Sequence, residues 1–147
     1  MSENKSVKIE FEVAGGDFER AGEASAKIKR MLQHLGVAAD IVRRIAIGTY
    51  EAEMNVIIHA GGGKVAAEVF SDETKITVSD SGPGIPDIEK ALQEGWSTAP
   101  DYARQMGFGA GMGLPNMVKC SDDFNIQSQV GVGTVITMSF KHISEDL

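Results

Sequence analysis

Glu51 and Asn55 are the first pair of residues in the sequence whose types and spacing could do chemistry. They lie four residues apart in a segment with helical apolar spacing, so a helix would place both side chains on one face. An amide oxygen is a hard ligand suited to Mg²⁺, and a neighbouring carboxylate can take a proton from a reacting hydroxyl. The alternative is an ordinary exposed polar set that includes Glu53, and the pair alone favours that alternative.

A second candidate site follows directly on a predicted strand, in the run Asp80-Ser81-Gly82-Pro83-Gly84-Ile85. A carboxylate at the end of a strand could accept a hydrogen bond from the amino group of adenine, whereas guanine offers a carbonyl at that position. Gly82 and Gly84 would let a base lie against the backbone. The alternative is a strand that simply ends in a glycine turn.

Glycines are concentrated at a third place, between Gly107 and Leu114, just before the last predicted helix. Free backbone amides at the start of a helix form an anion site, although a flexible hinge would have the same composition. Neither the GxxxxGK[ST] motif nor the GxGxxG frame of a dinucleotide fold is present.

The segment from Gly95 to Gly113 has no hydrophobic period and is long for a connection, which predicts a functional loop. Arg104 in this loop could reach a terminal phosphate, or it could be an ordinary solvated arginine.

The length and composition predict one globular domain over residues 1–147. A net charge of −7 argues against nucleic acid as a partner. The sequence shows no apolar run of the ~20 residues that span a bilayer and no signal peptide, and its one cysteine, Cys120, is expected to be a packed thiol. These features predict a cytoplasmic protein without a membrane partner.

The apolar periodicity predicts a succession of strands and helices. Helices are expected over residues 17–35, 40–60, 87–92 and 112–120, the first two capped by Asp17 and Asp40. Strands are expected over residues 7–13, 64–70, 74–79, 124–128 and 134–140. This order of elements predicts an α/β two-layer sandwich with one sheet and helices on one of its faces.

Taken in order, these motifs resemble those of the GHKL ATPase superfamily, which has the Bergerat fold. Glu51–Ala60 is similar to its N box, Asp80–Ile85 to its DxGxG box, Gly109–Leu114 to its second glycine box, and Gly133-Thr134 to its GT motif. The similarity extends from Ile41 to Phe140. It implies a mixed, mostly antiparallel sheet with helices on one face.

Within the superfamily, the chain is most similar to the small bacterial anti-sigma factor and switch-protein serine kinases. We expect a domain that stands alone, without the histidine-bearing dimerisation helices of a sensor kinase or the extra domains of gyrases, mismatch repair proteins and large chaperones. The run Gly95–Pro100 followed by Arg104 resembles the lid of this family, and Gly82–Ile88 resembles its switch-kinase members.

The resemblance implies ATP and Mg²⁺ as cofactors and assigns roles to individual residues. Glu51 would be the catalytic base, Asn55 the Mg²⁺ ligand, Asp80 the residue that reads adenine, and Arg104 the catalytic arginine at the γ-phosphate. The other implied ATP-binding residues are Gly82, Gly84, Ile85, Thr98, Ala99, Gly109, Gly111, Met112, Gly113, Leu114 and Thr134.

The function expected from this resemblance is that of an ATP-dependent serine/threonine protein kinase. Its substrate would be a serine or threonine hydroxyl on a small regulatory protein. The alternative is an ATP-gated binding module that sequesters a sigma factor or another regulator and transfers nothing, and hydrolysis of ATP by water is a third interpretation. Whether a sigma factor is a partner, and whether the chain forms a homodimer, are left open by the sequence.

Overall fold

A computed structural model of the protein describes residues 6–16, 18–93 and 113–142. Five strands form one sheet in the order β1-β2-β3-β5-β4, and all four neighbouring pairs are antiparallel. The expected mixed sheet is therefore fully antiparallel in the described part of the chain. The strands are β1 Val7–Ala14, β2 Gly62–Val69, β3 Glu73–Asp80, β4 Asp123–Gln129 and β5 Gly133–Lys141.

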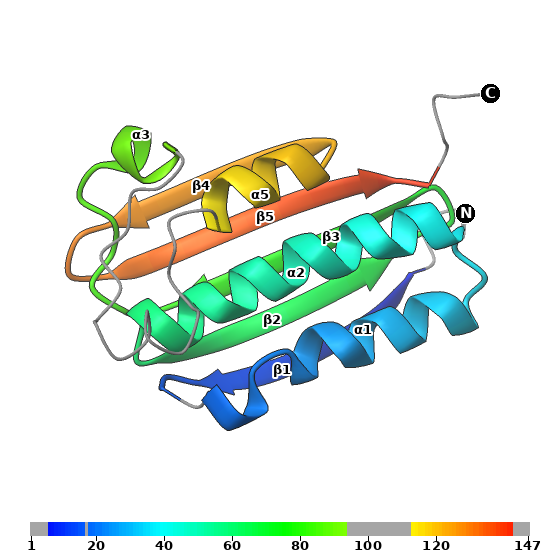
Figure 1. Cartoon of the computed structure of the whole chain (residues 1–147), viewed down its shortest axis with the longest axis horizontal. Helices are drawn as coiled ribbons and strands as arrows, with labels where there is room; N and C mark the ends of the chain where they lie inside the picture. Colours follow the sequence, from blue (N-terminus) through cyan, green and yellow to red (C-terminus); the bar gives the residue numbers. More distant parts are fainter. Residues whose placement is uncertain (1–5, 17, 94–112, 143–147) are drawn as a thin grey trace.

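The helices lie together on one face of this sheet, as Figure 1 shows. They are the short 3₁₀ helix η1 Phe18–Arg20, and α1 Glu23–His34, α2 Ala39–His59, α3 Ile88–Ala91 and α5 Gly113–Cys120. Helix α2 runs between α1 and α5 (Figure 1). The predicted α/β two-layer sandwich is confirmed. Among the described residues, no helix is both long and apolar enough to cross a membrane.

The core lies between the sheet and the helices because the strands alternate apolar and polar side chains. The predicted inner stripe of α2 is buried against the sheet, and Phe140 of β5 is fully buried beneath it. A Cβ atom built on Gly48 would lie 3.1 Å from Met138 Sδ and 3.2 Å from Phe140 Cζ. Glycine at position 48 therefore lets α2 approach β5 closely, which holds the polar residues further along the same helix at a defined height above the sheet.

The two predicted helix starts need correction. Helix α1 begins at Glu23, after Gly22 with a φ of 88°, and the proposed cap Asp17 lies outside the described residues. Helix α2 begins at Ala39, and its N-cap residue is Ala38, which has no side chain that could accept a hydrogen bond. Asp40 lies inside the first turn, where a negative charge interacts favourably with the helix dipole without capping the helix.

Glu53 of α2 caps the N-terminus of α1, which has no side-chain cap of its own. The interpretation of Glu53 as an exposed polar group is therefore wrong. Its side chain is 2% exposed, and its two carboxylate oxygens accept hydrogen bonds from Ser25 N at 3.0 Å and Ala24 N at 3.2 Å. These amides have no partner within the helix because they belong to its first turn. A side chain of α2 thus fixes where α1 begins.

We expect Glu53→Ala to lower the free energy of unfolding by about 1–3 kcal/mol, because it leaves two buried amides without an acceptor. Urea denaturation of the purified protein measures this change. Glu23→Ala is the matched control, since Glu23 is half exposed and pairs with Lys27 on the surface, where such pairs contribute at most about 1 kcal/mol. Equal and small losses in both variants would contradict the capping role.

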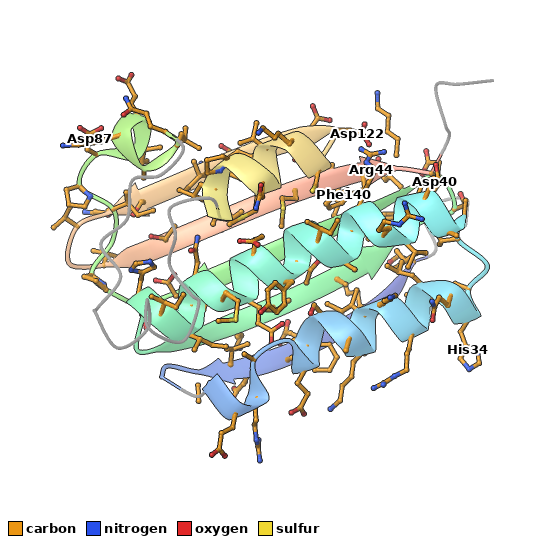
Figure 2. All side chains as sticks on the ribbon, viewed as in Figure 1. His34, Asp40, Arg44, Asp87, Asp122 and Phe140 are labelled. Atoms are coloured by element: carbon orange, nitrogen blue, oxygen red, sulfur yellow. The ribbon has the colours of Figure 1, made fainter. Side chains whose placement is uncertain are left out.

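Arg44 ties α2 to the connection between α5 and β4. Its Nε donates to the carbonyl of Cys120 at 2.9 Å, and its Nη2 lies 3.2 Å from Asp122 Oδ1. Figure 2 shows Arg44 and Asp122 side by side near the N-terminal end of α2. This contact holds the C-terminal end of α5 against α2, so the opposite end of α5 lies beside the later turns of α2.

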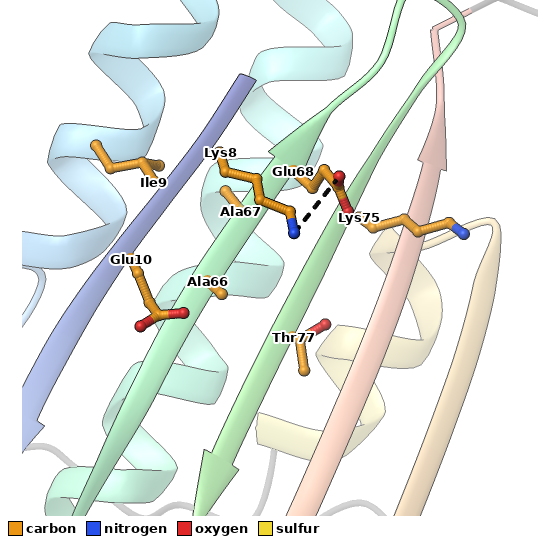
Figure 3. A pocket seen from close by; sticks show the side chains of 8 residues that line it. All are labelled: Lys8, Ile9, Glu10, Ala66, Ala67, Glu68, Lys75 and Thr77. Atoms are coloured by element: carbon orange, nitrogen blue, oxygen red, sulfur yellow. Dashed lines mark ion pairs between the residues drawn. The ribbon is translucent and has the colours of Figure 1, made fainter. Parts of the chain in front are cut away.

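The face of the sheet that the helices do not cover is polar. Figure 3 shows the residues that line a hollow on this face, where Lys8 Nζ lies 3.9 Å from Glu68 Oε2 across the β1–β2 pair. Ser6 Oγ donates to the same carboxylate oxygen at 2.7 Å. Such cross-strand pairs are typical of a solvated sheet face, and none of the predicted site residues lines this hollow.

Candidate functional site

Glu51 and Asn55 lie on the face of α2 that meets the start of α5. A Cβ atom built on Gly113 would lie 3.3 Å from Glu51 Oε2 and 3.4 Å from Asn55 Oδ1. The two oxygens therefore converge on one place, as the four-residue spacing predicts. Gly113 is the first residue of α5, so any side chain at this position would occupy the space in front of both oxygens.

The carboxyl group of Glu51 is partly withdrawn from water. Burial raises its pKa above the usual range, and a hydrogen bond from the side chain of Asn116 opposes part of this shift. Asn116 lies one turn into α5, three residues after Gly113. A carboxylate with a raised pKa is a better proton acceptor for a hydroxyl group than an ordinary surface carboxylate.

Asp80 is the last residue of β3 and begins the first glycine loop. Its Oδ1 accepts a hydrogen bond from Gly82 N at 2.9 Å, so one carboxylate oxygen is held by the loop itself. A Cβ atom on Gly82 would lie only 2.8 Å from Ala60 Cβ, just after the end of α2. The glycine at position 82 thus lets the loop pack directly against the end of the helix that carries Glu51 and Asn55.

Thr134 lies beside Asp80, as expected for two residues of one base-binding site. The two residues are paired across the β3–β5 ladder, and Thr134 is 7% exposed. The first glycine loop is also fastened to the β4–β5 hairpin, because Gly131 N donates to the carbonyl of Pro83 at 2.9 Å. Gly84 has a φ of 80°, which other residues rarely adopt, and its backbone lies against Gln129.

His59, one turn after Asn55 on α2, is a neighbour of Asp80. Burial lowers the pKa of His59, and the negative charge of Asp80 opposes this shift. Its imidazole therefore stays mostly neutral at neutral pH, and does not cancel the charge of Asp80. The helical spacing of Glu51, Asn55 and His59 is the signal that could have placed His59 on this side of α2.

The site follows the C-terminal half of α2. Nine residues separate Glu51 from Ala60, which is about 13 Å at 1.5 Å per residue. This is the scale of an extended nucleoside triphosphate, with Asp80 and Thr134 at one end and Glu51 and the start of α5 at the other. The structure therefore brings together the predicted residues Glu51, Asn55, Asp80, Gly82, Gly84, Ile85, Gly113, Leu114 and Thr134 along one path.

The remaining predicted site residues are part of the segment 94–112, outside the described residues. They are Arg104, Thr98, Ala99, Gly109, Gly111 and Met112. Their roles, and the predicted lid, stay predictions from the sequence.

Cys120 lies at the far end of α5 from this site. Its thiol is half-buried, and burial raises its pKa, with Glu51 adding to the shift and Arg44 opposing it. A thiol with a raised pKa is mostly protonated at neutral pH and is a poor nucleophile. The structure thus supports the expected packing role of Cys120.

The residues present fit the cofactors that the sequence motifs imply. Asn55 Oδ1 is a hard oxygen ligand beside Gly113, the first residue of α5, and Mg²⁺ usually takes one or two protein ligands besides phosphate oxygens and water. At the other end, the Asp80 carboxylate and the Thr134 hydroxyl form a polar pair against glycine backbone, which suits an amino-bearing base.

Known proteins share these features. A family model described as the histidine kinase-like ATPase domain matches residues 16–140. The serine/threonine-protein kinase RsbT of Bacillus subtilis is 33% identical over 112 residues, which cover 74% of this chain and 78% of RsbT. The anti-sigma F factor of Bacillus licheniformis is 32% identical over 128 residues, which cover 83% of this chain and 84% of that protein.

The fold also has a counterpart among solved structures. The crystal structure of the RsbU and RsbW domains of a Mycobacterium tuberculosis protein superposes with a TM-score of 0.59 at 15% identity. The match covers 92% of this chain and 32% of that longer chain, and at this identity it shows the fold alone. The family model and the two relatives carry the assignment further: the chain belongs to the histidine kinase-like ATPase family, in the group of anti-sigma factors and switch-protein serine kinases that its motifs resemble.

Proposed function

We propose that the protein is an ATP-dependent serine/threonine protein kinase of the bacterial anti-sigma regulatory type. In this proposal it binds ATP with Mg²⁺ and phosphorylates a hydroxyl group on a small regulatory protein. The observation that carries the proposal is the convergence of Glu51 Oε2 and Asn55 Oδ1 in front of Gly113. The relatives named as a serine/threonine kinase and an anti-sigma factor support the same class of activity and partner.

In this proposal, different residues of the chain have different roles in phosphoryl transfer. Asp80 and Thr134 hold the base, and the amides at the start of α5 face the phosphates. Asn55 would hold Mg²⁺, which would supply positive charge to neutralise the phosphate oxygens. Glu51 accepts the proton of the attacking hydroxyl, and Asn116 orients its carboxylate through the hydrogen bond between them. Phosphoryl transfer depends mainly on such positioning and charge stabilisation.

The proposal is tested by incubating the protein with γ-labelled ATP, Mg²⁺ and candidate regulatory proteins encoded by neighbouring genes. The expected result is label on a serine or threonine of one candidate, and no label when that residue is changed to alanine. Stable complexes with a partner that form only with ATP, and without any transfer, would instead favour the ATP-gated binding module. A carboxylate with a raised pKa beside the proposed metal ligand is the observation that favours the kinase over that alternative.

We expect Asn55→Ala to weaken binding of ATP in the presence of Mg²⁺ and to leave binding of metal-free ATP nearly unchanged. The reason is that Asn55 contributes one hard oxygen to the metal and no contact to the base. Calorimetric titrations with Mg²⁺ and with EDTA separate the two forms. Asn125→Ala is the matched control, because Asn125 is exposed on β4. An equal loss with and without metal would contradict the assignment of Asn55 as ligand.

A further inference from the structure

Ser128 lies where three segments of the base end of the site meet, although no sequence motif drew attention to it. It belongs to β4 and is paired directly with Thr134 of β5. Its Oγ accepts a hydrogen bond from Ile85 N, in the first glycine loop, at 2.7 Å. The same Oγ lies 2.8 Å from Thr134 Oγ1 and 3.2 Å from the carbonyl oxygen of Gly133.

These contacts favour one arrangement of the hydroxyl protons. A serine hydroxyl has one proton to donate and two lone pairs that accept. The Gly133 carbonyl can only accept, so a hydrogen bond at this contact uses the proton of Ser128, while Ile85 N occupies one lone pair. All three contacts are then satisfied together in one arrangement, in which Thr134 donates its own proton to the second lone pair of Ser128.

The consequence concerns the character of Thr134 toward a ligand. Once its proton points at Ser128, the Thr134 hydroxyl has only lone pairs left to offer. Asp80, its partner across the β3–β5 ladder, is also an acceptor when ionised. The side chains of Thr134 and Asp80, which flank the base end of the site, therefore both require a hydrogen-bond donor on the ligand. The 6-amino group of adenine carries two N–H donors, whereas the 6-carbonyl group of hypoxanthine or guanine carries none.

We propose that Ser128 is a positioning residue that locks the Thr134 hydroxyl as an acceptor, and so makes the site selective for bases with a 6-amino group. This inference rests on the proposed function, since it assumes that the site binds a purine nucleotide. If Ser128 had a purely structural role and only held the first glycine loop in place through Ile85, removing its hydroxyl would make the loop less ordered. The binding of every nucleotide would then weaken to the same extent.

The test compares the affinities of ATP and ITP, because ITP differs from ATP at the base alone. In Ser128→Ala, Thr134 is free to rotate and can donate its proton to the 6-carbonyl group of ITP. We expect the ratio of ATP affinity to ITP affinity to fall about tenfold, which is the usual size of one hydrogen-bond difference. If Ser128 only held the loop in place, Ser128→Ala would weaken the binding of both nucleotides equally and leave the ratio of their affinities unchanged.

Four further variants sharpen the test. Ser128→Thr keeps the hydroxyl and should keep the wild-type ratio. Ser121→Ala, which removes a hydroxyl bonded to the Met117 carbonyl at the far end of α5, should also keep it. In a Thr134→Val background, Ser128→Ala should change the ratio no further, because the locked hydroxyl is already gone. If Ser128→Ala does not fold, Ser128→Cys keeps the volume with a much weaker acceptor and serves in its place.

The outcomes separate this inference from the proposed function. A wild-type protein that prefers ATP, together with a Ser128→Ala variant whose ratio stays within twofold of wild type, would overturn the role of Ser128 alone. An equal fall in the ratio with and without Thr134 would overturn it too, since Ser128 would then not act through Thr134. A wild-type protein that binds ATP and ITP equally, or neither of them, would overturn the adenine site and this inference with it.

Discussion

Glu51→Gln is expected to slow phosphoryl transfer to the partner protein by about 10²–10⁴-fold, the usual contribution of a general base. Affinity for ATP should change little, because in the proposed mechanism Glu51 would act on the incoming hydroxyl and would bind neither the base nor the metal. A single-turnover assay with labelled ATP measures the transfer rate, and calorimetry measures the affinity in parallel. Glu68→Gln is the matched control, since Glu68 lies on the opposite face of the sheet.

Stability measurements distinguish this role from a structural one. Because burial raises the pKa of Glu51, the folded state binds this proton more tightly than the unfolded state does. The contribution of Glu51 to stability is therefore present at low pH and is lost as the pH rises through the raised pKa. At a pH above the raised pKa of Glu51, Glu51→Gln should unfold at the same or a higher temperature than wild type. A variant that transfers phosphate at nearly the wild-type rate but unfolds more easily would contradict the base role.

The pH dependence of transfer provides a second readout of the same group. A general base must be ionised to accept a proton, so the wild-type rate should fall as the pH drops through the raised pKa of Glu51. This acid limb should lie above the pH at which an ordinary exposed carboxylate titrates. The residual rate of Glu51→Gln should not show the limb.

Asp80→Asn is expected to lower the affinity for ATP by about tenfold to a hundredfold, the value of one hydrogen bond to a charged group. It should also reduce or reverse the preference for ATP over GTP. Gly82 N already bonds to Oδ1, so an amide oxygen would keep that position and the amide NH₂ would replace the other carboxylate oxygen. An NH₂ group donates, and the guanine carbonyl accepts.

Calorimetric titration of wild type and of Asp80→Asn with ATP and GTP gives the ratio of ATP affinity to GTP affinity for each protein. Asp123→Asn, at an exposed position of β4, makes the same chemical change away from the site and should alter neither affinity. A wild-type protein with equal affinity for the two nucleotides would contradict the role of Asp80.

The sequence predicted the parts of the fold that depend on local patterns. The apolar stripe of α2 and the alternation in the strands determined which faces are buried, and the first helix ends, as predicted, near residue 35, where it is followed by Gly36. Its backbone N–H bonds to the Gln33 carbonyl while Val37 N bonds to the Leu32 carbonyl, which is the usual pair of bonds around a left-handed C-terminal glycine. The four-residue spacing of Glu51 and Asn55 likewise predicted their convergence.

The predicted helix caps were wrong where a residue distant in sequence caps the helix in place of the expected local residue. Asp17 and Asp40 had the right type and place for helix caps, yet α1 is capped by Glu53 from the neighbouring helix, and α2 begins one residue before Asp40. A buried carboxylate that is contributed from 28 residues away leaves no local signal in the sequence. Glu53 accordingly looked like an exposed partner of Glu51.

The site residues that sequence reasoning missed are of two kinds. Asn116 becomes a partner of Glu51 only because α5 packs against α2, which a single sequence does not show. Ser128 could have been found, because a hairpin centred on Gly131 places it directly opposite Thr134. The direction of the hydrogen bonds of Ser128 could not have been predicted, because it depends on the position of the first glycine loop.

The most direct test of the whole account is a crystal structure of the protein with Mg²⁺ and a non-hydrolysable ATP analogue. The account predicts the 6-amino group of adenine at Asp80 beside Thr134, the metal on Asn55, and the terminal phosphate between the start of α5 and Glu51. A nucleotide bound elsewhere, or one whose base lies away from Asp80 and whose phosphates lie away from Asn55, would contradict it.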